Sequence, residues 1–128
     1  MILVVDDNDA VRRLTSRVLA DDGYAVMTAA DGVEALAMLD DSPGIAAVVT
    51  DLKMPRMDGH ELALRIAARW PGVRMLFMTG HPEASLMAGL PGPLMMKPYT
   101  PDALTATVRA LLNGGLGDIG PVVRREPA

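Results

Sequence analysis

The run Ala46-Ala47-Val48-Val49-Thr50-Asp51 decides the fold of this chain. Its apolar residues do not alternate with polar ones, which is the pattern of a strand covered on both faces, as in a parallel sheet. An aspartate at the end of such a strand is costly to place unless its charge is used. Three other apolar runs also end in polar residues: Ile2–Val5 before Asp6-Asp7, Met75–Met78 before Thr79, and Leu94–Met96 before Lys97. We therefore predict four strands that each end in a chemically useful side chain.

The segments between these runs have apolar residues at helical spacing and begin with capping side chains. The candidate caps are Asn8-Asp9, Asp31 with Glu34, Asp58 with Glu61, and Thr100 followed by Pro101. In the first helix we expect the buried face to be formed by Val11, Leu14, Val18 and Leu19. We expect the exposed face to be formed by Arg12, Arg13 and Arg17.

A further strand is expected over Ala25 to Ala29, and a helix of only about two turns over residues 82–89. Strands and helices then alternate, five of each, which predicts an α/β domain with a parallel sheet and right-handed crossovers. We expect the folded domain to comprise residues 1–113. Residues 114–128 are rich in Gly, Pro and Arg and are expected to form a flexible tail or linker.

Composition excludes several classes of function. The 128 residues fit one domain, and a net charge of -4 without a cluster of basic residues argues against a nucleic-acid surface. The chain has no cysteine, hence no disulfide framework and no thiolate metal site, and we expect a cytoplasmic protein. No stretch approaches the roughly 20 apolar residues that span a bilayer, so no membrane contact is expected.

The polar residues at the strand ends suggest phosphoryl chemistry. In an α/β sheet, ligands sit beyond the carboxyl ends of the strands. If the strands ending at Asp6-Asp7 and Asp51 are neighbours, their carboxylates repel one another unless a cation joins them, and an all-oxygen cluster suits Mg²⁺. Asp51 could then act as a carboxylate nucleophile that forms an aspartyl phosphate. Lys97 and Thr79 would supply a positive charge and a hydroxyl donor to the phosphoryl oxygens.

At these residues the chain resembles the response-regulator receiver domains of two-component signalling. The matching segments run in the order of the family: Leu3-Val4-Val5-Asp6-Asp7, Thr50-Asp51-Leu52-Lys53-Met54-Pro55, Met57-Asp58-Gly59, Met78-Thr79-Gly80 and Lys97-Pro98-Tyr99. The resemblance extends from Ile2 to about Asn113 and is nearest to receivers attached to hybrid sensor histidine kinases. It implies a flavodoxin-like, doubly wound sheet of five parallel strands in the order 2-1-3-4-5, with five helices.

The resemblance also implies a chemistry and a partner. Asp51 would accept a phosphoryl group from the phosphohistidine of a histidine kinase or phosphotransfer domain and relay the signal by conformational change, so the chain is expected to be a signalling phosphoacceptor and not an enzyme. Mg²⁺ would be held by Asp7, Asp51 and the Lys53 backbone carbonyl, and by Asp6 through water. The peptide bond between Lys97 and Pro98 is expected to be cis.

Two departures from the family pattern concern the surface that receivers use to report phosphorylation. Leu94 stands three residues before the lysine, where the family often has an aromatic residue. The interval from Thr79 to Lys97 is a few residues shorter than usual, which should shrink the fourth helix or the loop after it.

Two other functions fit parts of the pattern. Asp7-Asn8-Asp9 after an apolar strand matches the Asp-x-Asp of a Mg²⁺-dependent phosphohydrolase of the haloacid dehalogenase type, with Asp7 as the nucleophile. That interpretation leaves the segment around Asp51 unexplained. The other possibility is a receiver fold that does not accept phosphate and serves only as a binding module.

Overall fold

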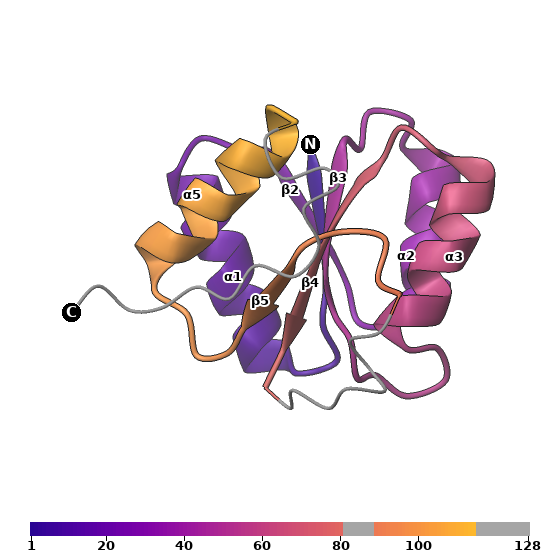
Figure 1. The fold of residues 1–128 in the computed structure, drawn as a ribbon, viewed down its shortest axis with the longest axis horizontal. Helices are drawn as coiled ribbons and strands as arrows, with labels where there is room; N and C mark the ends of the chain where they lie inside the picture. Colours follow the sequence, from indigo (N-terminus) through magenta and orange to yellow (C-terminus); the bar gives the residue numbers. More distant parts are fainter. Residues whose placement is uncertain (81–88, 115–128) are drawn as a thin grey trace.

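The computed structural model describes residues 1–80 and 89–114, which form one parallel sheet flanked by helices (Figure 1). The elements are β1 (Ile2–Val5), α1 (Asp9–Asp21), β2 (Val26–Ala29), α2 (Gly32–Asp41), β3 (Ala47–Asp51), α3 (Gly59–Arg69), β4 (Arg74–Thr79), β5 (Leu94–Met96) and α5 (Pro101–Leu112). The five strands lie in the order β2-β1-β3-β4-β5 and are all parallel, which confirms the predicted flavodoxin-like sheet.

The described part of the chain contains four of the five predicted helices. The short helix expected over 82–89 falls almost wholly outside the described residues, as does nearly all of the predicted tail, 114–128. None of the described helices has the length and apolar character needed to cross a membrane.

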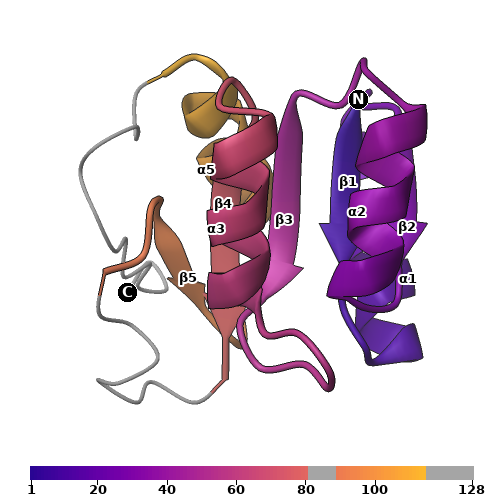
Figure 2. The same cartoon turned by 90° about the vertical axis from the view of Figure 1, so that its right-hand side faces the viewer.

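Both faces of the sheet are covered, which explains why the strands are apolar without alternation. Helices α1 and α5 lie on one face, and α2 and α3 on the other (Figures 1 and 2). Alternate strand residues pack into two separate cores. The core under α1 and α5 contains Ile2, Val4, Ala47, Val49, Leu76, Met78 and Met95, and the core under α2 and α3 contains Leu3, Val5, Val48, Met75, Phe77 and Leu94.

All four described helices begin at the caps predicted from the sequence. In each helix the side chain of the capping residue accepts a hydrogen bond from the backbone N–H three positions later: Asn8 from Val11, Asp31 from Glu34, Asp58 from Glu61, and Thr100 from Ala103. Each cap satisfies a backbone donor that the helix leaves unpaired, and this fixes the point at which each loop from the sheet enters its helix.

The predicted faces of α1 are wrong at two positions. Leu14 was assigned to the buried face, but it is 60% exposed, whereas Thr15 and Leu19 are buried. Arg12 was assigned to the exposed face, but its side chain is only 17% exposed. Thr15, whose hydroxyl is hydrogen-bonded to Tyr99, therefore occupies the buried position that hydrophobicity alone assigned to Leu14.

Replacing Gly59 with alanine should destabilise the fold. A Cβ at Gly59 would lie 2.5 Å from the backbone oxygen of Asp51 and 3.0 Å from the Cα of Leu52, so backbone must shift to admit it. We expect Gly59→Ala to lower the free energy of unfolding by about 1–3 kcal/mol in urea denaturation. Gly72→Ala is the matched control, because a Cβ at Gly72 meets nothing within 4 Å. Equal midpoints for the two variants would contradict the prediction.

Candidate functional site

The carboxyl ends of the strands bring the predicted site residues to one edge of the sheet. Asp6 follows β1, Asp51 ends β3, Thr79 ends β4 and Lys97 follows β5. The registers that align these ends pair Val5 with Thr50, Asp51 with Met78, and Thr79 with Met96. Because the strands are parallel and end nearly level, residues far apart in the sequence meet at this edge.

Three carboxylates cluster at this edge. Asp6, Asp7 and Asp51 each offer one oxygen, and these oxygens lie within 4.8 Å of one another. Asp6 is buried, Asp51 is partly buried and Asp7 is exposed. A cluster of oxygen ligands that is open to water on one side fits the preference of Mg²⁺, which keeps several water ligands.

Lys97 connects two of these carboxylates. Its Nζ lies 3.3 Å from Asp6 Oδ2 and 3.2 Å from Asp51 Oδ2. Burial alone would lower the pKa of Lys97, but the negative charges of Asp51 and Asp6 outweigh burial and raise its pKa above the ordinary value. The side chain therefore remains a cation at the end of the sheet.

Asp51 is less acidic than an ordinary aspartate. Burial is the largest cause of its raised pKa, and the charge of Asp6 acts in the same direction. The ammonium group of Lys97 and the backbone N–H of Lys53, which lies 3.5 Å from Asp51 Oδ1, oppose the rise only in part. The ionised form of Asp51 is thus destabilised and gains from any further positive charge brought to the site.

Asp6 is fixed in place from the start of α1. Its side chain is 1% exposed and accepts a hydrogen bond of 2.9 Å from the backbone N–H of Asn8. The guanidinium of Arg12 donates to the backbone oxygen of Asp6 at 2.8 Å and also pairs with Asp9. The sequence did not reveal this role of Arg12, because helical spacing alone placed it among exposed arginines.

Two further residues at the edge come from the last two strands. Thr79 is 1% exposed, and its backbone oxygen accepts a hydrogen bond of 2.8 Å from the N–H of Lys97. The peptide bond between Lys97 and Pro98 is cis, as expected from the resemblance. From this point the Lys97 side chain extends toward Asp51.

The loop from β3 to α3 is held by a contact that the sequence did not indicate. Arg56 has a backbone φ of 68°, a left-handed conformation that is rare for residues other than glycine. Its guanidinium pairs with Asp31, the N-cap of α2. Asp31 was predicted only as a cap, and no periodicity or motif links it to Arg56, which lies 25 positions away.

Leu94 and Tyr99 flank Lys97 on opposite sides in the sequence. Leu94, at the position where receivers often have an aromatic residue, is 1% exposed and packs into the core under α2 and α3. Tyr99 lies on the other face of the sheet, where its hydroxyl hydrogen-bonds the buried hydroxyl of Thr15 in α1. The tyrosine ring therefore joins the loop after β5 to α1.

A doubly wound sheet in this order defines a flavodoxin-like α/β protein, and an acidic cluster and a lysine lie at its carboxyl edge, where ligands of such sheets bind. The family model described as "Response regulator receiver domain" matches residues 2–109. The chain belongs to this family of two-component signalling domains.

The chain is similar to one segment of a sensor kinase and to one segment of a response regulator. It is 35% identical over 116 residues to the sensor kinase CckA of Brucella abortus (strain 2308), covering 87% of this chain and 12% of that protein. It is 39% identical over 125 residues to the response regulator MprA of Mycobacterium sp. (strain KMS), covering 94% of this chain and 54% of that protein. Among solved structures, the receiver domain from the hybrid histidine kinase CckA has a TM-score of 0.75 at 31% identity, covering 87% of this chain and 97% of that one. The chain thus spans about half or less of the length of these two curated relatives.

Replacing Asp51 with asparagine should stabilise the fold at pH 7 in a buffer that contains a metal chelator. Because the pKa of Asp51 is raised in the folded state, ionisation of this carboxyl lowers stability at neutral pH. This loss of stability disappears as the pH falls below 3.8, the ordinary pKa of an aspartate, because Asp51 is then protonated in both the folded and the unfolded state. Urea denaturation should therefore show the largest gain for Asp51→Asn at pH 7 and a shrinking gain on acidification. A variant that is less stable than the parent at pH 7 would contradict this expectation.

Proposed function

We propose that this chain accepts a phosphoryl group on Asp51 from the phosphohistidine of a histidine kinase or phosphotransfer domain. One observation carries the proposal: the Asp51 carboxylate lies 3.2 Å from the ammonium group of Lys97 and within the same cluster as two further carboxylates. A lone structural aspartate needs no such surroundings. A carboxylate that must hold a phosphoryl group needs positive charge on one side and a cation site on the other.

The transfer is an exchange of bonds at phosphorus. A carboxylate oxygen of Asp51 forms a new P–O bond while the P–N bond to the donor imidazole breaks. The electron pair of the broken bond stays on the imidazole nitrogen, which takes up a proton as neutral histidine forms. The product is an aspartyl phosphate, and its later reaction with water returns the carboxylate and inorganic phosphate.

The remaining residues would stabilise the transferred group. Lys97 already points at Asp51 and would meet a phosphoryl oxygen with its ammonium group, while Thr79, at the end of β4 beside the Asp51 strand, would donate its hydroxyl to another. Neither residue needs to exchange a proton with the phosphoryl group. Their role in the proposal is to balance charge and to fix its orientation.

The donor set fits Mg²⁺, and we propose that Asp7, Asp51 and the backbone carbonyl of Lys53 hold it, with Asp6 contributing through water. When bound, the ion would supply positive charge that offsets the repulsion among the carboxylates and between them and the incoming phosphoryl group.

We further propose that residues 1–113 are the phosphoaccepting domain, that 114–128 are a flexible tail or linker, and that the domain acts in the cytoplasm as a signalling module.

A mass measurement distinguishes Asp51 from Asp7 as the modified residue. Incubation with acetyl phosphate and Mg²⁺ should add one phosphoryl group to the parent chain, and chelation of Mg²⁺ should reduce the modified fraction by at least about tenfold. Asp51→Asn should remain unmodified, because its amide cannot form the acyl phosphate. The measurement is intact-mass spectrometry, with borohydride trapping to locate the modified residue.

The same experiment tests the two alternatives. If Asp51→Asn is still modified and Asp7→Asn is not, with sustained hydrolysis of phosphomonoesters, the chain is a phosphohydrolase of the haloacid dehalogenase type. If the parent chain neither gains mass nor binds Mg²⁺, it is a binding module with a receiver fold. Either outcome overturns the proposal.

The donor protein would dock beside Lys97, on the exposed side of α1. Leu14 is 60% exposed and, with Val11, Pro98 and Tyr99, lines an apolar hollow of about 340 Å³ that also includes Lys97. A phosphohistidine must approach within bonding distance of Asp51, so its carrier must cover this part of the surface. We propose that the apolar residues of the hollow pack against the carrier.

Replacing Leu14 with glutamine should slow transfer from a protein donor by about tenfold, since it removes an apolar contact near the centre of the proposed interface. Modification by acetyl phosphate should be unchanged. Transfer would be measured with whichever autophosphorylated kinase from a panel phosphorylates the parent chain. Leu64→Gln in α3 is the matched control, because Leu64 is 56% exposed and lies on the opposite face. Equal rates for both variants would exclude this docking surface.

A further inference from the structure

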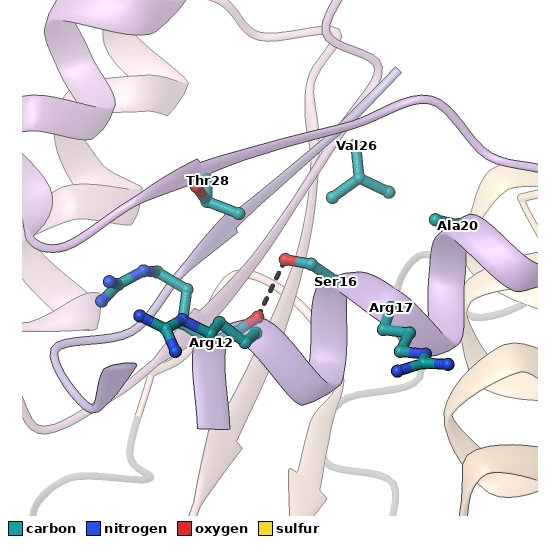
Figure 3. Close-up of a pocket in the computed structure, with 7 residues that line it drawn as sticks. Arg12, Ser16, Arg17, Ala20, Val26 and Thr28 are labelled. Atoms are coloured by element: carbon teal, nitrogen blue, oxygen red, sulfur yellow. Dashed lines mark hydrogen bonds between the residues drawn. The ribbon is translucent and has the colours of Figure 1, made fainter. Parts of the chain in front are cut away.

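A second groove runs between α1 and the edge strand β2 (Figure 3). It has a volume of about 450 Å³, and the small residues Ser16 and Ala20 of α1 lie across it from Val26 and Thr28 of β2. Its remaining lining residues are three arginines of α1: Arg12, Arg13 and Arg17. A groove of this composition favours a ligand with negative charge and some apolar surface.

The three arginines are not equally available. Arg12 is committed to the backbone of Asp6 and to Asp9. Arg17 is exposed and has only a long contact of 4.0 Å with Asp21, which is itself exposed, so solvent screens the pair. Arg13 is exposed, and within 1–80 and 89–114 no residue hydrogen-bonds its side chain or forms an ion pair with it. The outer rim of the groove therefore presents two guanidinium groups to solvent.

The other wall of the groove is the open edge of the sheet. In the described part of the chain, strand β2 pairs with β1 and with no other strand, and the backbone oxygens of Ala25 and Ala29 accept hydrogen bonds from Ile2 and from Asp6, which follows β1. Because successive backbone groups of a strand point to opposite sides, the N–H and C=O groups of Val26 and Thr28 face away from β1. An exposed edge of this kind can pair with an added strand.

The two walls have matching spacings. Arg13 and Arg17 are one helical turn apart, a rise of about 6 Å. In an extended chain, side chains on the same face repeat about every 6.6 Å. A strand added to β2 would therefore bring alternate side chains past Arg13 and Arg17 in turn.

We propose that this groove binds an extended acidic segment of a partner protein, which adds to the edge of β2 and places alternate carboxylates against Arg13 and Arg17. A second copy of this chain does not fit. Pairing two β2 edges about a two-fold axis would bring the arginine rims of both copies to the same face, where like charges oppose association. The docking site is independent of phosphoryl acceptance, because neither Arg13 nor Arg17 contacts the acidic cluster.

The test uses the full chain, labelled with ¹⁵N, and a peptide of about seven residues that alternates Glu and Val. We expect the amide signals of Val26 and Thr28 to shift most.

The double variant Arg13→Gln/Arg17→Gln should weaken binding by at least about tenfold, and binding to the parent should weaken as salt is raised. Arg65→Gln, on α3, is the matched control and should bind as the parent does. Both arginine variants should still be modified by acetyl phosphate to the same extent as the parent, which shows that they fold.

Two peptide controls separate strand addition from general attraction between opposite charges. The same peptide with Gln in place of Glu should lose binding. A peptide N-methylated on the residues whose N–H groups would face β2 should also lose binding, because it cannot complete the ladder. Equal binding of the N-methylated peptide, or shifts confined to Arg13 and Arg17, would overturn the proposal, as would the absence of binding.

Discussion

One ammonium group shared by two carboxylates is the constraint around which this edge of the sheet is built. Asp6 and Asp51 extend β1 and β3, which are neighbours, so their charges repel. Lys97 starts from β5, two strands from β3, and reaches both carboxylates across the end of β4. The parallel arrangement makes this possible, because it brings all the strand ends to one side. The two cores on either side of the sheet hold the strands in the register that this contact needs.

Much of this arrangement could be predicted from residue patterns. Continuous apolar runs identified the strands, since only a strand covered on both faces can be apolar throughout, and the polar residues that ended them marked the site. Asp31, Asp58 and Thr100 identified helix starts because a side-chain oxygen there satisfies a free backbone N–H. The order of the strands did not follow from these patterns. It came from the resemblance to receiver domains, and the sheet has that order.

The predictions failed where tertiary contacts outweighed local pattern. Leu14 is apolar and at helical spacing, yet Thr15 is the buried residue, because its hydroxyl bonds to that of Tyr99, 84 positions along the chain. Arg12 belongs to an arginine-rich face, yet it turns inward to the backbone of Asp6. Hydrophobicity ranks side chains by their transfer from water and takes no account of a partner that satisfies a buried polar group. Such pairs become visible only in three dimensions.

The pair formed by Arg56 and Asp31 has a mechanical consequence. A left-handed conformation costs a residue with a side chain about 1–2 kcal/mol, so the backbone of the loop from β3 to α3 is strained at Arg56. The ion pair between Arg56 and Asp31 holds this conformation. Because its arginine is largely exposed, dissolved ions weaken the pair. The loop that carries Lys53 is therefore held by an ion pair that ionic strength can weaken, and the partner of Arg56 in this pair, Asp31, is the N-cap of α2. This ion pair therefore links the loop beside Asp51 to the start of α2.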